Sequence, residues 1–172
     1  GIKLYDNEFI SKVAEETGLS EEYIENNEQK RDVLASLNNG YYSGLNNSDE
    51  LFIKESELIK EVADKESCVI VGRCADFILA DRENVINVFV YSDMNDKINR
   101  ATTYYGMDKA KAEKEIRRID KLRANHYKYY TDKDWDNHSN YDICINSDAF
   151  GVEKSADLIC ELVESKLEMV KA

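Results

Sequence analysis

The sequence predicts an α/β protein whose parallel sheet is flanked by helices. Short runs rich in β-branched residues alternate, along the 172 residues, with longer stretches of helical periodicity, and this alternation is typical of parallel sheets with crossover helices. The two clearest strands, at 68–71 and 85–91, are nearly continuous apolar runs, as expected of parallel strands buried on both faces. Between them there is room for one short helix at 75–80.

The first strand is predicted at residues 2–5, and Asp6 is the expected N-cap of the helix that follows. A second helix begins after Ser20, and residues 38–49, rich in Asn, Gly, Ser and Tyr, form a loop. The next helix is amphipathic, with one charged residue, Glu55, on its apolar face. This helical region therefore connects the first two strands.

The second half of the chain continues the alternation. Three helices and one strand are predicted there, at residues 93–105, 109–130 and 152–170 and at residues 141–145 respectively. No internal repeat and no shift in composition divides the sequence. A single domain over residues 1–172 is therefore predicted.

Composition narrows the classes of function. The formal charge of −12 argues against a nucleic acid partner, because polyanions require a basic surface. No apolar run approaches the ~20 residues of a membrane span, so no membrane partner is expected. The four cysteines show no CxxC spacing, and there are only two histidines. Neither a disulfide framework nor a metal site is indicated, and a reducing cytoplasm fits this usage.

The first candidate site follows the strand at 68–71, where the sequence reads Gly72-Arg73-Cys74-Ala75-Asp76. Ligands of open α/β sheets bind beyond the carboxyl ends of the strands. Gly72 permits a sharp exit, and Arg73 would offer a bidentate fork to an anion. Asp76 would orient this arginine or accept hydrogen bonds from a ligand amine. The alternative is a local Arg73–Asp76 ion pair that only stabilises the turn, and the spacing does not separate the two.

The second candidate site is a local reversal of charge. Residues 109–128 hold eight basic and three acidic side chains, which indicates either a polyphosphate site or a solvated helix face with i,i+4 pairs. At ~100° per residue, Arg123 falls inside the apolar arc of this helix, with Asp120 at the edge of the arc. A guanidinium there is costly to desolvate unless it is paired or meets an anionic ligand. Arg123 is therefore the most informative cation, and Asp120 is its expected partner.

Several segments occur in the order found in a known family. They are Leu4-Tyr5-Asp6, residues 68–76, the run from Asp120 through Arg123 to the tyrosines and Thr131, and Asn140-Tyr141-Asp142 ahead of Asn146-Ser147. In these segments the chain resembles bacterial cytidylate kinase-like proteins, which are P-loop nucleoside monophosphate kinases. The resemblance covers essentially the whole chain.

The resemblance implies a three-layer P-loop NTPase-type sheet, an arm that binds the nucleoside monophosphate at about residues 19–66, and a lid at about residues 107–140. It implies ATP and Mg²⁺, with CMP or dCMP as the first acceptor. Family members begin with a strand and a phosphate loop of the GxxGSGG kind, and this sequence contains no such loop. Because Gly1 is not a Met, the natural chain is expected to begin further upstream. Without the loop's amides, the 172 residues alone are not expected to be a competent kinase.

The resemblance also implies the roles of individual residues. The substrate-binding residues would be Gly72, Arg73 and Asp76, with Asp6 as a further candidate beside its simpler role as a helix cap. The catalytic lid residues would be Arg123, Asp120 and, more loosely, Arg117. Asn146 and Ser147 would lie near the adenine of the donor. In cytidylate kinases proper the Asp follows Gly-Arg directly, whereas here Cys74 and Ala75 intervene, which affects the cytosine assignment.

Two alternative functions follow from the same features. One is a P-loop kinase for another small acceptor, and the other is a catalytically silent nucleotide-binding or regulatory module. The architecture has a consequence of its own. If the missing segment supplies a central strand, as the strand order of the resembled family implies, strands 2–5 and 68–71 should pair in parallel on one side of it, and strands 85–91 and 141–145 on the other.

Overall fold

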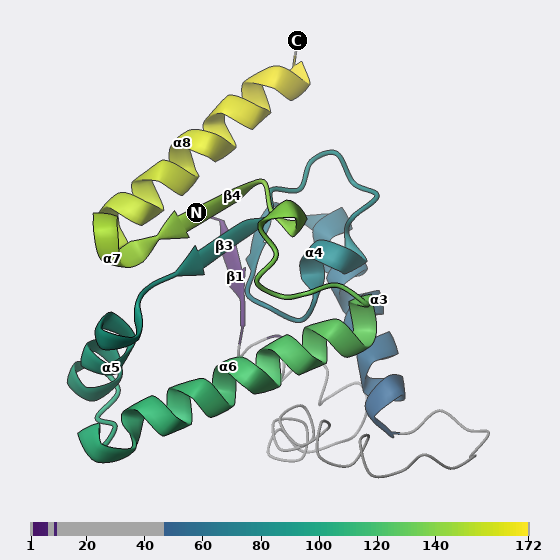
Figure 1. Cartoon of the computed structure of the whole chain (residues 1–172). Coiled ribbons are helices and arrows are strands. Elements are labelled where there is room, and N and C mark those ends of the chain that lie inside the picture. The colour runs from purple at the N-terminus through teal and green to yellow at the C-terminus, as the bar shows by residue number, and fades with distance from the viewer. Residues whose placement is uncertain (1, 7–8, 10–46, 172) are drawn as a thin grey trace. The chain divides into compact units, whose positions relative to one another are not determined.

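The computed structural model describes residues 2–6, 9 and 47–171, which divide into two units (Figure 1). Unit 1 takes the described residues up to Ala80 together with Asn125–Asp132, and unit 2 takes Asp81–Ala124 and the residues from Lys133 onward. None of the described helices combines the length and the apolar composition that crossing a membrane requires.

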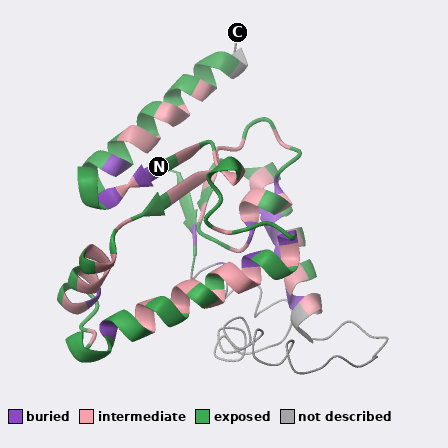
Figure 2. Ribbon diagram, in the orientation of Figure 1, coloured by how far each residue is buried: buried purple, intermediate pink, exposed green. Residues whose placement is uncertain are grey.

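Unit 1 is built on two parallel strands, β1 (Lys3–Tyr5) and β2 (Cys68–Ile70), in which Leu4 lies opposite Val69. The helix α3 (Asn47–Lys65) precedes β2, and the short helix α4 (Ala75–Ile78) follows it. The core of this unit is the apolar face of α3 (Figure 2), where the buried apolar side chains are Leu51, Leu58, Ile59 and Val62. Burial of this amphipathic face therefore stabilises the helix within unit 1.

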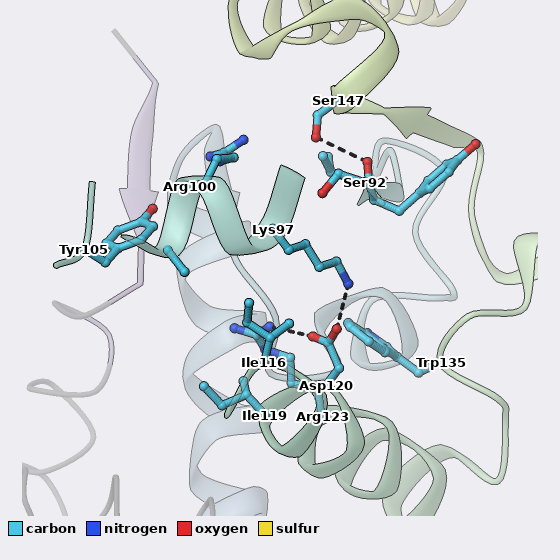
Figure 3. A pocket seen from close by; sticks show the side chains of 13 residues that line it. Ser92, Lys97, Arg100, Tyr105, Ile116, Ile119, Asp120, Arg123, Trp135 and Ser147 are labelled. Atoms are coloured by element: carbon cyan, nitrogen blue, oxygen red, sulfur yellow. Dashed lines mark hydrogen bonds and ion pairs between the residues drawn. The ribbon is translucent and has the colours of Figure 1, made fainter. Parts of the chain in front are cut away.

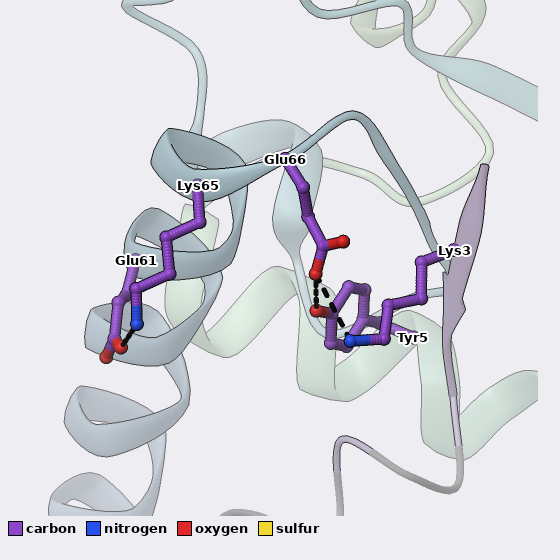
Figure 4. A network of polar contacts seen from close by, with 5 residues as sticks. All are labelled: Lys3, Tyr5, Glu61, Lys65 and Glu66. Atoms are coloured by element: carbon purple, nitrogen blue, oxygen red, sulfur yellow. Dashed lines mark hydrogen bonds and ion pairs between the residues drawn. The ribbon is translucent and has the colours of Figure 1, made fainter.

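One carboxylate joins the first strand to the end of α3 (Figure 4). The Tyr5 hydroxyl donates to Glu66 Oε1 at 2.5 Å, and Lys3 Nζ donates to the same oxygen at 3.3 Å. The hydrogen bond to Glu66 is the main cause that raises the pKa of the Tyr5 hydroxyl, with burial second. The same carboxylate raises the pKa of the Lys3 ammonium group.

Unit 2 contains the second parallel pair, β3 (Val88–Tyr91) and β4 (Ile143–Asn146), in which Val90 lies opposite Ile145. The Asp93 side chain caps the next helix by accepting a hydrogen bond from the Asp96 amide at 2.8 Å. The helical elements are α5 (Met94–Thr103), α6 (Lys109–Thr131), whose last turns belong to unit 1, the 3-10 helix η1 (His138–Asn140), α7 (Ser147–Phe150) and α8 (Val152–Lys171).

An aromatic cluster holds the segment after α6 against β3. Trp135 meets the Phe89 ring edge-on, with ring centroids 5.4 Å apart, and Tyr141 stacks on Phe89 at 4.9 Å. The Tyr141 hydroxyl donates to the backbone carbonyl of Trp135 at 2.6 Å. Trp135 is therefore fixed beside β3.

Both predicted strand pairings are confirmed, since each pair is parallel and forms its own two-stranded sheet. The predicted boundaries of the second pair are wrong by a few residues. The Asn87 backbone carbonyl accepts hydrogen bonds from the amides of Asp142 and Ile143, and its own amide donates to the Asp142 carboxylate at 2.6 Å. This side-chain bond replaces a regular ladder, so β3 starts at Val88 and β4 at Ile143.

The predicted loop at 38–49 also ends too late, because α3 begins at Asn47. Asp and Ser residues at 48–49 suit the first turn of a helix, where amides lack partners and the dipole favours acidic groups. The helices predicted after Asp6 and after Ser20 lie outside the described residues.

The predicted burial of the strands on both faces is wrong for several side chains. Val69, Val71 and Val90 are 49%, 52% and 52% exposed. With only two strands, each described sheet leaves part of its surface uncovered by the described helices. The described residues thus form a mixed α/β fold with parallel strands, while the three-layer sheet and the phosphate loop stay predictions.

Candidate functional site

The backbone beyond β2 turns through three successive residues in the left-handed region. Their φ angles are 76° at Gly72, 62° at Arg73 and 55° at Cys74. Glycine adopts this conformation freely, whereas each of the other two residues pays roughly 1–2 kcal/mol. The turn closes with a hydrogen bond of 3.1 Å from the Ala75 amide to the Gly72 carbonyl. The sharp exit expected at Gly72 therefore extends over three residues, and surrounding contacts must hold it.

Arg73 makes the first of these contacts. Its Nη1 lies 3.0 Å from Oε1 of Glu55, and the two side chains are only 10% and 0% exposed. The alternative ion pair between Arg73 and Asp76 is wrong, because the arginine reaches α3 instead. Removal of one partner from a buried pair costs ~3–5 kcal/mol, so this bond stabilises the position of the guanidinium strongly. Glu55, a lone charge on an apolar helix face, was the sequence signal for a buried cation.

Asp76 has a different partner. The hydroxyl of Tyr127, near the end of α6, donates to Asp76 Oδ2 at 2.5 Å, and the Tyr127 residue is 4% exposed. In the same turn of the helix Tyr130 stacks on Phe52, with centroids 3.8 Å apart and planes at 13°. The tyrosines of this segment therefore pack within unit 1, and one of them reaches the turn after β2.

Asp6, the remaining predicted residue of unit 1, lies in a bend after β1 and is exposed. Its backbone carbonyl accepts a hydrogen bond from the Phe9 amide at 3.2 Å. The helix that Asp6 was predicted to cap lies outside the described residues.

Unit 2 contains a pocket of about 360 Å³ at the carboxyl ends of β3 and β4 (Figure 3). This volume lies in the range of roughly 300–1,000 Å³ that is usual for small-molecule sites. Its charged lining is three cations and one carboxylate, namely Lys97, Arg100, Arg123 and Asp120. Its aromatic lining consists of Tyr91, Tyr105 and Trp135. The pocket is therefore net positive in a chain of net charge −12, which favours an anionic ligand.

Asp120 forms ion pairs with two of the three cations (Figure 3). Its Oδ2 lies 2.6 Å from Lys97 Nζ on α5, and its Oδ1 lies 3.2 Å from Arg123 Nη1 one turn further along α6. The side chains of Lys97 and Asp120 are 32% and 24% exposed. The predicted pairing of Asp120 with Arg123 is confirmed, and the same carboxylate also fixes a lysine from a second helix.

Although its position falls inside the apolar arc of the helix, the side chain of Arg123 is 61% exposed. A long aliphatic stem lets an arginine whose Cα lies near an apolar arc carry its head group to the edge of that arc. Here the head group meets Asp120 and the pocket wall. Arg123 is thus placed to contact a ligand and carries little of the folded core.

The predicted residues at the end of β4, at the start of α7 and on α6 complete the set. Ser147 is 8% exposed, donates to the Tyr91 carbonyl at 3.2 Å and lines the pocket. Asn146 caps α7 by accepting a hydrogen bond from the Asp148 amide at 3.1 Å. Arg117 is 64% exposed and pairs with Glu113 at 2.8 Å, outside the lining of this pocket. That arrangement matches the solvated-face interpretation of the charge run.

Two pocket cations, Lys97 and Arg100, were not among the predicted site residues. Their spacing of three residues places them on neighbouring positions of one helix face. They lie on α5, directly after a strand end. A basic i,i+3 pair just beyond an apolar strand was the signal that could have identified them.

Comparison with known proteins places this chain in a family. The model of the cytidylate kinase-like family matches residues 1–149. A cytidylate kinase of Archaeoglobus fulgidus is 29% identical over 108 residues, which are 62% of this chain and 59% of that protein. The crystal structure of an uncharacterized protein from Eubacterium ventriosum ATCC 27560 matches with a TM-score of 0.67 and 26% identity, over 95% of this chain and 83% of that one.

The chain therefore spans less than two thirds of the curated relative's length, while the family model covers most of the chain. The parallel strand pairs, the Gly-Arg turn after β2 and the Asp120–Arg123 pair on α6 agree with that match. The protein belongs to the cytidylate kinase-like family.

Proposed function

We propose that this protein catalyses the ATP-dependent phosphorylation of a nucleoside monophosphate, with CMP or dCMP as the preferred acceptor. The observation that carries the proposal is the cationic pocket of unit 2, in which Asp120 holds Lys97 and Arg123. Membership of the family supports a nucleotide kinase-like function. The reaction breaks the bond between the γ-phosphorus and its bridging oxygen and forms a bond from that phosphorus to an oxygen of the acceptor phosphate.

The lining of the pocket suits the phosphates of a donor nucleotide. Phosphoryl transfer depends on positioning and on neutralising charge that spreads over the phosphate oxygens. Lys97 and Arg100 on α5 and Arg123 on α6 provide ammonium and guanidinium donors to the pocket, and a guanidinium can bind phosphate through two parallel hydrogen bonds. Asp120 reduces the freedom of two of these cations before the ligand arrives, which lowers the entropy cost of binding.

Mg²⁺ would enter bound to the phosphates of ATP, because the described residues contain no cluster of His, Cys, Asp or Glu that could hold a metal ion alone. Magnesium keeps several waters and binds through one or two carboxylates together with substrate phosphates. When bound, the magnesium–ATP complex supplies the phosphoryl group with part of its charge already neutralised. The side chains that would hold the phosphates are Lys97, Arg100 and Arg123, and Ser147 would lie toward the base.

The proposed acceptor site is the turn after β2 in unit 1. Arg73 would bind the acceptor phosphate, while Asp76 would accept a hydrogen bond from an amino group of the base. Glu55 balances the charge of Arg73 within an almost fully buried pair. No general base is needed, because the acceptor phosphate already carries the attacking oxygen.

Ligand binding tests this proposal in the full-length protein. Trp135 is the single tryptophan of the chain and lines the pocket, so ATP is expected to change tryptophan fluorescence in a saturable way. CMP and dCMP are expected to raise the melting temperature more than AMP or GMP, since ligands that bind only the native state stabilise it by mass action. A protein that responds to neither ATP nor any nucleoside monophosphate contradicts the proposal. Equal shifts with all four monophosphates would remove only the preference for cytosine.

A further inference from the structure

We propose that Tyr127 is a positioning residue that determines acceptor specificity, because its hydroxyl fixes the direction of the Asp76 carboxylate. The fixed carboxylate then favours a base that carries an amino group, cytosine over uracil. This inference rests on the proposed function, since it concerns the acceptor site of the same reaction.

The hydrogen bond joins two elements that are distant in sequence. Tyr127 Oη lies 2.5 Å from Asp76 Oδ2 across a separation of 51 residues, a distance typical of a hydroxyl that donates to an ionised carboxylate. The buried Tyr127 cannot swing its hydroxyl away without disturbing the packing of its ring. Its backbone carbonyl also accepts a hydrogen bond from the Thr131 hydroxyl at 2.6 Å.

The hydrogen-bonded backbone around Asp76 also restricts this residue. It is the second residue of α4, directly after the left-handed residues Gly72, Arg73 and Cys74. The Cys74 carbonyl accepts hydrogen bonds from the amides of Phe77 and Ile78, at 3.0 and 2.9 Å. The backbone and the tyrosine together leave the half-buried carboxylate little freedom to rotate.

The second carboxylate oxygen is the part that a ligand would meet. Tyr127 takes Oδ2, and in the part of the chain that the structure describes no other group bonds the Asp76 carboxylate. An ionised carboxylate can only accept hydrogen bonds. Oδ1 therefore selects ligands that present a donor.

Cytosine and uracil differ at the group that would face such an oxygen. Cytosine presents an N4 amino donor, whereas a base with a carbonyl at that position presents an acceptor. A carboxylate held in one direction repels the carbonyl, but a carboxylate that is free to turn avoids this repulsion. Sites built to bond one polar group reject an analogue that lacks it, because the buried partner is then left unpaired. Tyr127 thus contributes to discrimination without touching the base.

Tyr127→Phe tests the inference, because it removes the hydroxyl and keeps the ring. The steady-state parameters for CMP and UMP at saturating ATP, the KM for ATP and the melting temperature are measured in the full-length protein. Because a hydrogen bond to a charged group is involved, the KM for CMP is expected to rise roughly tenfold to a hundredfold. The preference for CMP over UMP in kcat/KM falls by a similar factor. The KM for ATP stays the same, and the melting temperature stays within a few degrees.

Tyr129→Phe is the matched control on the same helix. Tyr129 is 56% exposed and meets the Tyr130 ring edge-on at 4.8 Å, so loss of its hydroxyl should change none of these parameters. In an Asp76→Asn background, Tyr127→Phe should cause little further loss of preference, because residues that act through one another are not additive.

The possible failures are distinguishable. If Tyr127→Phe behaves like the control, or lowers only the melting temperature, the inference is overturned while the proposed function stands. If the parent protein phosphorylates neither CMP nor any other nucleoside monophosphate, the proposed function fails and the inference fails with it.

Discussion

At the scale of single residues, Arg123 is the side chain on which the proposed chemistry depends most. It is 61% exposed and bonded to Asp120 within one helical turn, and an exposed pair of this kind contributes only ~0–1 kcal/mol to stability. Arg123→Ala should therefore leave the melting temperature within a few degrees of the parent. A cation that neutralises the transition state is worth ~10³–10⁵ in rate, so kcat and kcat/KM should fall together by at least ~10²-fold.

Arg118→Ala is the control for that measurement. Arg118 lies on the same helix, is 49% exposed and pairs with Glu115 away from the pocket, so its loss should change neither turnover nor stability. Normal turnover of Arg123→Ala would remove Arg123 from the site, and unfolding of that variant would make it a structural residue.

Glu55 is predicted to act on stability. Glu55→Ala removes the carboxylate that balances Arg73 in a pair with exposures of 0% and 10%, and the free energy of unfolding should fall by ~3–5 kcal/mol. Urea denaturation measures this change. Glu57→Ala on the same helix removes a 63% exposed partner of Lys54 and should cost no more than ~1 kcal/mol. Similar losses in the two variants would contradict the buried pair.

At the scale of elements, the bond between β1 and the end of α3 predicts a pH dependence. The pKa of Tyr5 is raised from 10.0 and that of Lys3 from 10.5, both through Glu66. A raised pKa means that the folded state holds its proton more tightly, so this contribution is complete below the unfolded pKa and is lost as pH rises through the folded pKa. The melting temperature should therefore decline more steeply above about pH 10 in the parent than in Tyr5→Phe. Parallel curves would show that the bond does not couple to folding.

Features of these elements could be predicted from the sequence where the interacting residues are close together in the chain, and not where they are far apart. Apolar runs predicted where the strands lie, because such runs are local in sequence, whereas the pairing of the strands was implied by the resemblance to the family. The start of β3 was not predictable, since it depends on the bond between Asn87 and Asp142, 55 residues apart. The pairing of Lys97 with Asp120 was missed for the same reason, because the two residues lie on different helices. The Asp120–Arg123 pair was predicted because both residues share one helical turn.

At the scale of the whole molecule, the distribution of charge limits what the protein binds. The chain carries a net charge of −12, yet the pocket of unit 2 is lined by three cations and one carboxylate. A locally positive pocket attracts a small anion, whereas the acidic chain as a whole, at −12, disfavours extended polyanions. ATP binding should therefore weaken as salt is raised, whereas RNA or DNA should not compete with it. Competition by nucleic acid in a fluorescence titration would contradict this account.

The central claim is transfer of a phosphoryl group between nucleotides, and direct product analysis tests it. Full-length protein is incubated with ATP, Mg²⁺ and one acceptor at a time, CMP, dCMP, UMP, AMP or GMP, and the products are quantified by phosphorus NMR. Equal amounts of ADP and the acceptor's diphosphate are expected, formed fastest with CMP or dCMP. Formation of ADP and inorganic phosphate without any nucleoside diphosphate from the acceptor would show that the phosphoryl group is transferred to water. No reaction in a protein that binds both nucleotides would indicate a silent binding module, and either result would contradict the claim.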